Sequence, residues 1–263
     1  MSFFVGKLLG STLKGRGPIV YNEDKMKTEI LYEDADVIVI RKLAGFPTES
    51  AKATQLDVVS ELRNYLSTEQ NKKPYIGVVH RLDQPVEGLL VFAKNKKAAA
   101  GLTKQLEEGS LNKQYYAVAF NQPSVQEGVL EDYLIKDPVK KVAKVVTADT
   151  EGAQKASLRY RVVAGIQGRV LYAIRIDTGR FHQIRVQMAH AGMPLLGDQK
   201  YADEATKIYA KHLGIRNVAL CAFQVGFVHP VNGKKLVFTT LPRGEAFQPF
   251  VDLIGKTLGN RPL

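Results

Sequence analysis

The sequence has few of the residues and segments that would place it outside the ordinary intracellular proteins. Cys221 is its only cysteine, which excludes an internal disulfide and, within the apolar stretch VALCAFQVGF, predicts an inert core thiol in a reducing compartment. No apolar run approaches the roughly 20 residues that a membrane span requires. The opening segment lacks the apolar region and cleavage site of a signal peptide. We therefore expect a cytoplasmic protein without membrane contact.

Motifs for metals and nucleotides are also missing. None of the five histidines is spaced as in the common zinc motifs, and a single cysteine adds little. Gly10 and Gly15 have the spacing of a phosphate loop, but Arg16 and Gly17 follow where lysine and a hydroxyl residue are needed. We expect neither a metal nor an organic cofactor.

Acidic residues are the minority among the charged ones. The 263 residues include 37 Lys and Arg against 26 Asp and Glu, a formal net charge of +11. A polyanion is the natural partner of such a chain, because neutralised phosphates release counterions and basic surfaces steer association. The alternative is an enzyme that happens to be basic, since charge alone names no reaction.

The hydrophobic pattern favours an α+β domain. Residues 1–28 are polar and basic and predict an N-terminal arm, whereas residues 29–263 predict one domain. Helical spacing occurs near 55–66, 96–109, 182–192 and 203–212 and from about 246, and short alternating strands fill most of the remainder. We expect an extended, mixed but mainly antiparallel β-sheet flanked by helices.

The stretch VVHRLDQPVEGLLVFAKN, at residues 78–95, places charge at the start of an apolar strand. Its segment His80, Arg81, Leu82 and Asp83 predicts a loop, where a rigid scaffold can present reactive side chains. The alternative is a turn aspartate whose carboxylate bonds nearby backbone.

A second charged segment, TGRFHQIR, follows the strand GRVLYAIRID. Arg185 lies in the first turn of the predicted helix, where the helix dipole disfavours a cation, so we expect it to have an acidic partner. In NKQYYAVAF, the side chains of Tyr115 and Tyr116 point to opposite faces of a strand. At most one of them can therefore serve a site, and ordinary packing of both is the alternative.

Together these stretches resemble the RluA family of RNA pseudouridine synthases. The likeness runs from about Ile30 to Pro242 and is carried by ILYEDADVIVIRKLAG, HRLDQPVEGLLVFAKN, NKQYYAVAF and TGRFHQIRVQMAHAGMPLLGDQKY, with LCAFQVGFVHPVNGKK as a weaker match. The resemblance implies a pseudouridine synthase fold with a catalytic cleft across the sheet. It implies isomerisation of uridine in structured RNA, with large-subunit rRNA favoured over tRNA, no DNA partner and no cofactor.

The resemblance also implies roles for particular residues. Asp83 is the catalytic aspartate, Arg185 its pairing arginine, and Tyr115 the ring placed against the target base. The target base must leave its stack, and His80 and Arg81 are the candidates for extruding it. Residues expected to support the substrate pocket are Leu82, Gly88, Arg180, His182, Gln183 and Ile184.

The chain departs from the family pattern at several positions. Leu43 replaces a usual proline, Val86 and Glu87 replace a common Thr-Ser pair, and Gln187 and Cys221 replace frequent histidines. Too few residues precede Ile30 for the small N-terminal RNA-binding domain of many relatives. Target selection would then rest on the catalytic domain, with Lys136, Lys140, Lys141 and Lys144 as a group that contacts phosphates.

Two other functions fit some of the same residues. One is a non-catalytic RNA-binding protein of ribosome assembly on the same fold, and the other is a glycoside hydrolase using Asp83 with Glu87. A complete set of Asp83, Tyr115 and Arg185 argues against the first, and the charge of +11 argues against the second. A monomer is the default assembly.

Overall fold

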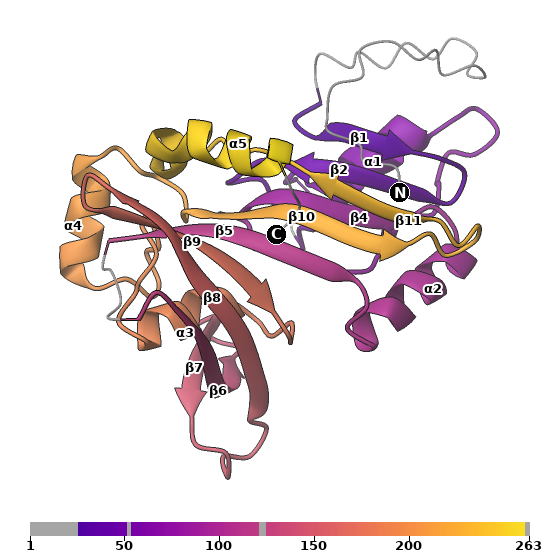
Figure 1. Cartoon of the computed structure of the whole chain (residues 1–263). Helices are drawn as coiled ribbons and strands as arrows, with labels where there is room; N and C mark the ends of the chain where they lie inside the picture. Colours follow the sequence, from indigo (N-terminus) through magenta and orange to yellow (C-terminus); the bar gives the residue numbers. More distant parts are fainter. Residues whose placement is uncertain (1–25, 52–53, 121–124, 261–263) are drawn as a thin grey trace. The chain divides into compact units, whose positions relative to one another are not determined.

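The computed structural model describes residues 26–51, 54–120 and 125–260. These fall into two compact units (Figure 1). Unit 1 contains the described residues up to Asn112 together with Gln224–Thr240, and unit 2 contains Lys113–Phe223 and the described residues from Leu241 onward. All but the last three residues of the predicted arm lie outside the described part of the chain. That residues 29–263 form one catalytic domain stays a prediction.

Unit 1 is an antiparallel β structure with two helices. β1 pairs with β2, β2 with β4, and the short β3 with β4, while β11 pairs with β10. Its strands and helices are β1 (Glu29–Glu33), β2 (Val37–Lys42), β3 (Gly77–Val78), β4 (Glu87–Ala93), β10 (Leu220–Val228, which begins in unit 2), β11 (Lys235–Thr239), α1 (Val58–Leu66) and α2 (Lys96–Glu107).

The core of unit 1 lies between the strands and α2. The buried cluster joins alternate residues of β2 and β4 to Ala98 and Leu102 of α2 and to Val225 and Phe227 of β10. The Asn95 side chain accepts from the Ala98 N–H and caps α2. The predicted helix is thus confirmed, and it ends before Gly109, whose φ of 70° suits the turn that follows.

Unit 2 is built on five antiparallel strands in the order β5, β9, β8, β6 and β7. Their bounds are β5 (Asn112–Ala119), β6 (Glu127–Asp137), β7 (Val142–Val146), β8 (Gln154–Ile166) and β9 (Arg169–Ile176). The helical elements are α3 (Gln183–His190), α4 (Glu204–His212), the 3-10 helix η2 (Glu245–Phe250) and α5 (Val251–Asn260).

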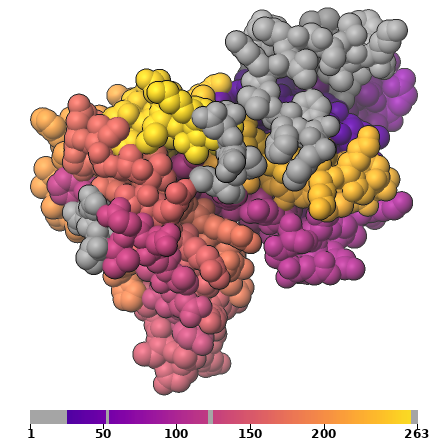
Figure 2. Space-filling model, in the orientation of Figure 1, coloured from indigo at the N-terminus to yellow at the C-terminus, as the bar shows by residue number. Residues whose placement is uncertain are grey.

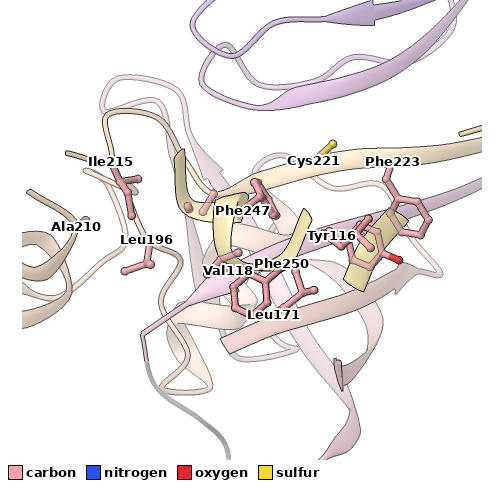
Figure 3. Packing of buried hydrophobic residues seen from close by; sticks show 13 residues of the cluster. Tyr116, Val118, Leu171, Leu196, Ala210, Ile215, Cys221, Phe223, Phe247 and Phe250 are labelled. Carbon is pink, nitrogen blue, oxygen red and sulfur yellow. The ribbon is translucent and has the colours of Figure 1, made fainter. Parts of the chain in front are cut away.

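One face of these strands packs on η2 and α5. Tyr116 and Val118 of β5 and Leu171 of β9 share a buried cluster with Phe247 and Phe250 of η2 (Figure 3). The Tyr116 ring stacks on Phe223 with centroids 3.9 Å apart. Cys221 is fully buried in the same cluster, which confirms it as a core thiol.

The opposite face carries α3, through a cluster of Leu134, Ala143, Ala156 and Val186. The strand register pairs Tyr115 with Ile174, Ile174 with Tyr160, and Tyr160 with Gly128. Side chains alternate along a strand, so Tyr115 lies on the same face as Leu134, the face on which α3 packs. The expectation that Tyr116 faces away from Tyr115 is confirmed.

The α+β class and the mainly antiparallel pairing are confirmed. α1 begins at Val58, later than the pattern predicts, because Asp57 caps it by accepting from the Ser60 N–H. The last helix begins as the 3-10 turn η2, which contains Pro249. Within the described residues, no helix is both long and apolar enough to cross a membrane.

Candidate active site

The loop that carries Asp83 is fastened to unit 1 on both sides. The Thr48 hydroxyl donates to the Leu82 carbonyl at 3.0 Å and accepts from the Leu82 N–H at 3.4 Å. The imidazole Nε2 of buried His80 accepts from the Val91 N–H of β4 at 3.3 Å. These bonds hold the backbone around Asp83 in one place.

Within the segment 80–83, Arg81 and Asp83 are accessible, whereas His80 and Leu82 are buried. Asp83 is partly exposed, and its carbonyl accepts from the Val86 N–H at 3.0 Å, which closes a tight turn. The Arg81 side chain is 71% exposed and its guanidinium lies 3.7 Å from the Glu49 carboxylate. An exposed pair of this kind is weak. Arg81 can therefore leave Glu49 for another anion at little cost.

Lys42, which was not among the residues expected to form the site, lies beneath the loop. It is fully buried at the end of β2, and its ammonium donates to the carbonyls of Phe46 at 2.6 Å and of Leu43 and Gln84 at 3.0 Å. Three acceptors match the three N–H groups of an ammonium. Gln84 directly follows Asp83, so Lys42 anchors the backbone of the candidate nucleophile.

The charge of Lys42 is balanced by nearby carboxylates. Burial lowers the pKa of Lys42 to about 7, while the negative charges of Asp83 and Glu87 act to raise it. Glu87, which departs from the family pattern, is itself buried. The sequence held one signal for Lys42, which is its place at the end of the apolar strand VIVIRK. A lysine that folding buries there rarely lacks a function or partner.

A group of potential metal ligands in unit 1 is better explained as a hydrogen-bond network. Asp34, Asp36 and His229 place one ligand atom each within 4.8 Å of one another. Asp34 Oδ2, however, accepts from the Tyr32 hydroxyl at 2.7 Å and lies 2.9 Å from His229 Nε2. His229 Nδ1 accepts from two backbone N–H groups, so the proton is on Nε2. These atoms are already used, and the network secures the β10–β11 turn.

Arg185 has the acidic partner that its position requires. Its Nε and Nη2 lie 2.7 and 2.8 Å from the two carboxylate oxygens of Asp198. Both side chains are almost fully buried. Such a bidentate pair fixes the plane of the guanidinium, and the Tyr201 ring lies 5.2 Å from Arg185 Cζ.

The loop that supplies Asp198 has a conformation that only glycine suits. Gly197 has a φ of 75°, and a Cβ added there would lie 2.0 Å from the backbone oxygen of Asn217. Asp198 Oδ1 also accepts from the N–H groups of Lys200 and Tyr201. Asp198 was not among the residues expected to form the site. An aspartate directly after the apolar PLLG was the signal.

Tyr115 is buried in the middle of β5, on the face that carries α3. Lys113, two residues earlier, shares that face, and burial lowers its pKa to about 8. The strand thus places a phenol and an amine of lowered pKa along one side of unit 2.

The turn before α3 is held by Gln183. Its Oε1 accepts from the Thr178 hydroxyl at 2.8 Å and the Arg180 N–H at 2.9 Å, and its Nε2 donates to the Ser157 carbonyl at 3.0 Å. His182 adopts a left-handed conformation, with a φ of 53°, and its Nδ1 lies 2.7 Å from the Tyr201 hydroxyl. Ile184 is buried beside these residues.

The four predicted phosphate-contacting lysines lie on the β6–β7 hairpin, whose turn residues 138–141 are exposed. The hairpin forms the lower end of unit 2 in the space-filling view (Figure 2). Lys140 and Lys141 are in the turn, Lys136 lies over the Phe181 ring, and Lys144 is 3.1 Å from Asp137.

The predicted site residues thus form two groups, one in each unit. Unit 1 brings together His80, Arg81, Leu82, Asp83 and Gly88, and unit 2 brings together Tyr115, Arg180, His182, Gln183, Ile184 and Arg185. Their catalytic roles, the pairing of Arg185 with Asp83 and the cleft stay predictions. Lys42 and Asp198 add to each group a residue that positions its members.

Comparisons with known proteins agree on one family. The model of the family described as RNA pseudouridylate synthase matches residues 36–190. The ribosomal large subunit pseudouridine synthase D of Zymomonas mobilis is 33% identical over 218 residues, covering 80% of this chain and 68% of that protein. The ribosomal large subunit pseudouridine synthase C of Haemophilus influenzae is 29% identical over 228 residues, covering 86% and 69%.

Solved structures show the same fold. The human RNA pseudouridylate synthase domain containing 4 aligns with a TM-score of 0.65 at 25% identity, covering 82% of this chain and 89% of that one. The human RNA pseudouridylate synthase domain containing 1 aligns with a TM-score of 0.69 at 19% identity, covering 89% and 96%. The expected pseudouridine synthase fold is thereby confirmed.

Proposed function

Because this chain belongs to the RNA pseudouridylate synthase family and is therefore an RNA-modifying isomerase, we propose that its substrate is a uridine of large-subunit ribosomal RNA. The observation that carries this proposal is the likeness to the large-subunit enzyme of Zymomonas mobilis at 33% identity. The net charge of +11 supports a structured polyanion as the partner.

The proposed chemistry centres on Asp83. The N1–C1′ bond of uridine breaks, the uracil rotates, a C5–C1′ bond forms, and the proton on C5 is replaced by one on N1. The Asp83 carboxylate serves this reaction as a nucleophile at C1′ or as a stabiliser of the positive charge that develops there. Its partial exposure and its fastened backbone support either role.

The other proposed residues act on the base and on Asp83. Tyr115 contacts the uracil ring and accepts the C5 proton, and Arg185 pairs with the Asp83 carboxylate. Arg81 extrudes the target base from its stack, whereas His80, which is buried and bonded to β4, holds the loop that carries Arg81. The exposure of Arg81 and its weak tie to Glu49 support a side chain that moves into the RNA.

Pseudouridine mapping of cellular RNA tests the proposed substrate. Cells that lack this protein should lose pseudouridine at one or a few uridines of large-subunit rRNA, and expression of the wild-type chain should restore them. The Asp83→Asn chain should not restore them. A loss confined to tRNA would overturn the proposed substrate while leaving the isomerase activity intact.

A further inference from the structure

Phe181 is an exposed aromatic residue in a rigid setting. Its side chain is 36% exposed, in the turn that leads into α3. The backbone on either side is held, since the Gln183 side chain accepts from the Arg180 N–H and the His182 carbonyl accepts from the Val186 N–H at 3.0 Å. A large apolar ring kept at the surface by such a framework has little entropy left to lose on binding.

The two faces of the Phe181 ring are differently occupied. The His182 imidazole stacks on the ring with centroids 3.8 Å apart and planes 20° from parallel. The ammonium of Lys136, from β6, lies 4.8 Å from the ring centroid. Because the imidazole fills one face, the ammonium occupies the other. Lys136 is exposed, so it can leave that face at small cost.

The surroundings of the ring are cationic. Arg180 is exposed and its Nε donates to the Lys155 carbonyl at 3.0 Å. Lys155 is exposed too, in a solvent-exposed ion pair with Glu131 at 3.1 Å, and Lys140 lies in the adjacent hairpin turn. An exposed aromatic ring among cations is the arrangement by which proteins bind single-stranded nucleic acid, with the base stacked on the ring and phosphates on the cations. An apolar protein partner would instead need a larger apolar patch.

We propose that Phe181 is a stacking platform for an unpaired base of the RNA, with His182 supporting the ring from behind. The base takes the place of the Lys136 ammonium over the ring, and Lys136 moves to a neighbouring phosphate. The inference rests on the proposed function only in that RNA is the substrate; it does not depend on which RNA. The protein would therefore recognise an unpaired nucleotide as part of its RNA substrate.

The chain contains no tryptophan, so Phe181→Trp places at the platform a single tryptophan, whose emission can be excited selectively in the presence of the 11 tyrosines. Its fluorescence should be quenched by a ten-residue oligouridine and unaffected by a blunt RNA duplex or by inorganic phosphate. The matched control is Tyr133→Trp, since Tyr133 is also 36% exposed but lies on the opposite face of β6 from Leu134. Equal quenching of both proteins would overturn the proposal.

Affinity separates stacking from apolar contact and from structural damage. Phe181→Leu and Phe181→Ala should each weaken oligouridine binding roughly 5- to 100-fold, while Phe181→Trp should bind at least as tightly as the wild type. The melting temperature of Phe181→Leu should stay close to that of the wild type, because leucine keeps an apolar side chain in the partly covered position of the ring. If Phe181→Leu binds like the wild type, the platform does not exist. Since oligouridine binding is read out without turnover, an error about ribosomal RNA leaves this result unaffected.

Discussion

Lys42 is a fully buried lysine next to the candidate nucleophile, and its protonation state should be visible in the rate. Its pKa of about 7 means that the ammonium loses a proton as the pH rises through neutrality. A neutral amine has only two N–H groups for three carbonyls and no charge to set against Asp83. We therefore expect kcat of the wild-type enzyme to fall between about pH 6 and pH 9.

Glu87 should set the midpoint of that fall. Its negative charge raises the pKa of Lys42, so Glu87→Gln should move the midpoint to lower pH, and Lys42→Met should abolish this limb of the profile. Steady-state tritium release across the pH range measures both. A flat wild-type profile, or a midpoint that moves upward in Glu87→Gln, would contradict the assignment.

Stability should change in the opposite direction above about pH 7. The pKa of Lys42 is lower in the folded chain, at about 7, than its ordinary value of 10.5. Between those values the unfolded chain binds more protons, so this group contributes stability that rises with pH and is lost as the pH falls toward 7. A loss of activity above neutral pH could not then be attributed to unfolding caused by deprotonation of Lys42.

The buried ion pair of Arg185 with Asp198 should contribute strongly to the free energy of unfolding. Asp198→Asn leaves a buried guanidinium without its bidentate anion, which should lower the free energy of unfolding by about 3–5 kcal/mol. Asp177→Asn is the control, because its partner Arg159 is exposed and the two lie 3.4 Å apart. The control should cost at most about 1 kcal/mol. Urea denaturation compares the two variants, and equal effects would contradict the role of Asp198.

Among the helices and strands, the alternation of residues along each strand predicted which side chains share a face of the sheet. Alternation alone separated Tyr115 from Tyr116, and the register confirms that the two rings serve different faces. What the pattern could not supply was the pairing of distant segments. Asp198 reaches Arg185 across 13 residues of chain, and Lys42 reaches Gln84 across 42. Such contacts depend on tertiary packing, which local sequence does not encode.

The β6–β7 hairpin should contribute to RNA affinity through charge alone. Lys140 and Lys141 are exposed in its turn, and a lysine that contacts a phosphate releases about one counterion. The double variant Lys140→Gln, Lys141→Gln should therefore bind all RNA sequences more weakly. The slope of log affinity against log salt should fall by about 2. Filter binding at several salt concentrations measures this slope.

A control with the same net charge isolates the hairpin. Lys207→Gln, Lys211→Gln removes the same two charges from α4, so both double variants have a net charge of 11 − 2 = +9. If the hairpin contacts phosphates, the slope of log affinity against log salt should fall only in the Lys140→Gln, Lys141→Gln variant. Equal slopes would mean that the general charge of the protein, and not these lysines, sets RNA affinity.

At the scale of the whole molecule, the sequence was informative wherever several motifs occurred in a fixed order. The stretches around Asp83, Tyr115 and Arg185 led to the family that the comparisons show. The α+β class followed from alternating short strands between amphipathic helices. The choice of RNA did not follow, because a basic surface binds every phosphate backbone. Phe181 was equally hard to find, since an exposed aromatic residue becomes distinctive only when His182 and Lys136 are seen against it.

Asp83 is proposed to carry out uridine isomerisation in large-subunit rRNA. Tritium release from [5-³H]uridine-labelled transcripts reports this reaction, with wild-type and Asp83→Asn proteins compared on rRNA and tRNA. We predict release from rRNA by the wild type, none by Asp83→Asn, and unchanged RNA binding by both. Equal release by the two proteins would contradict the assignment of Asp83 as the catalytic residue.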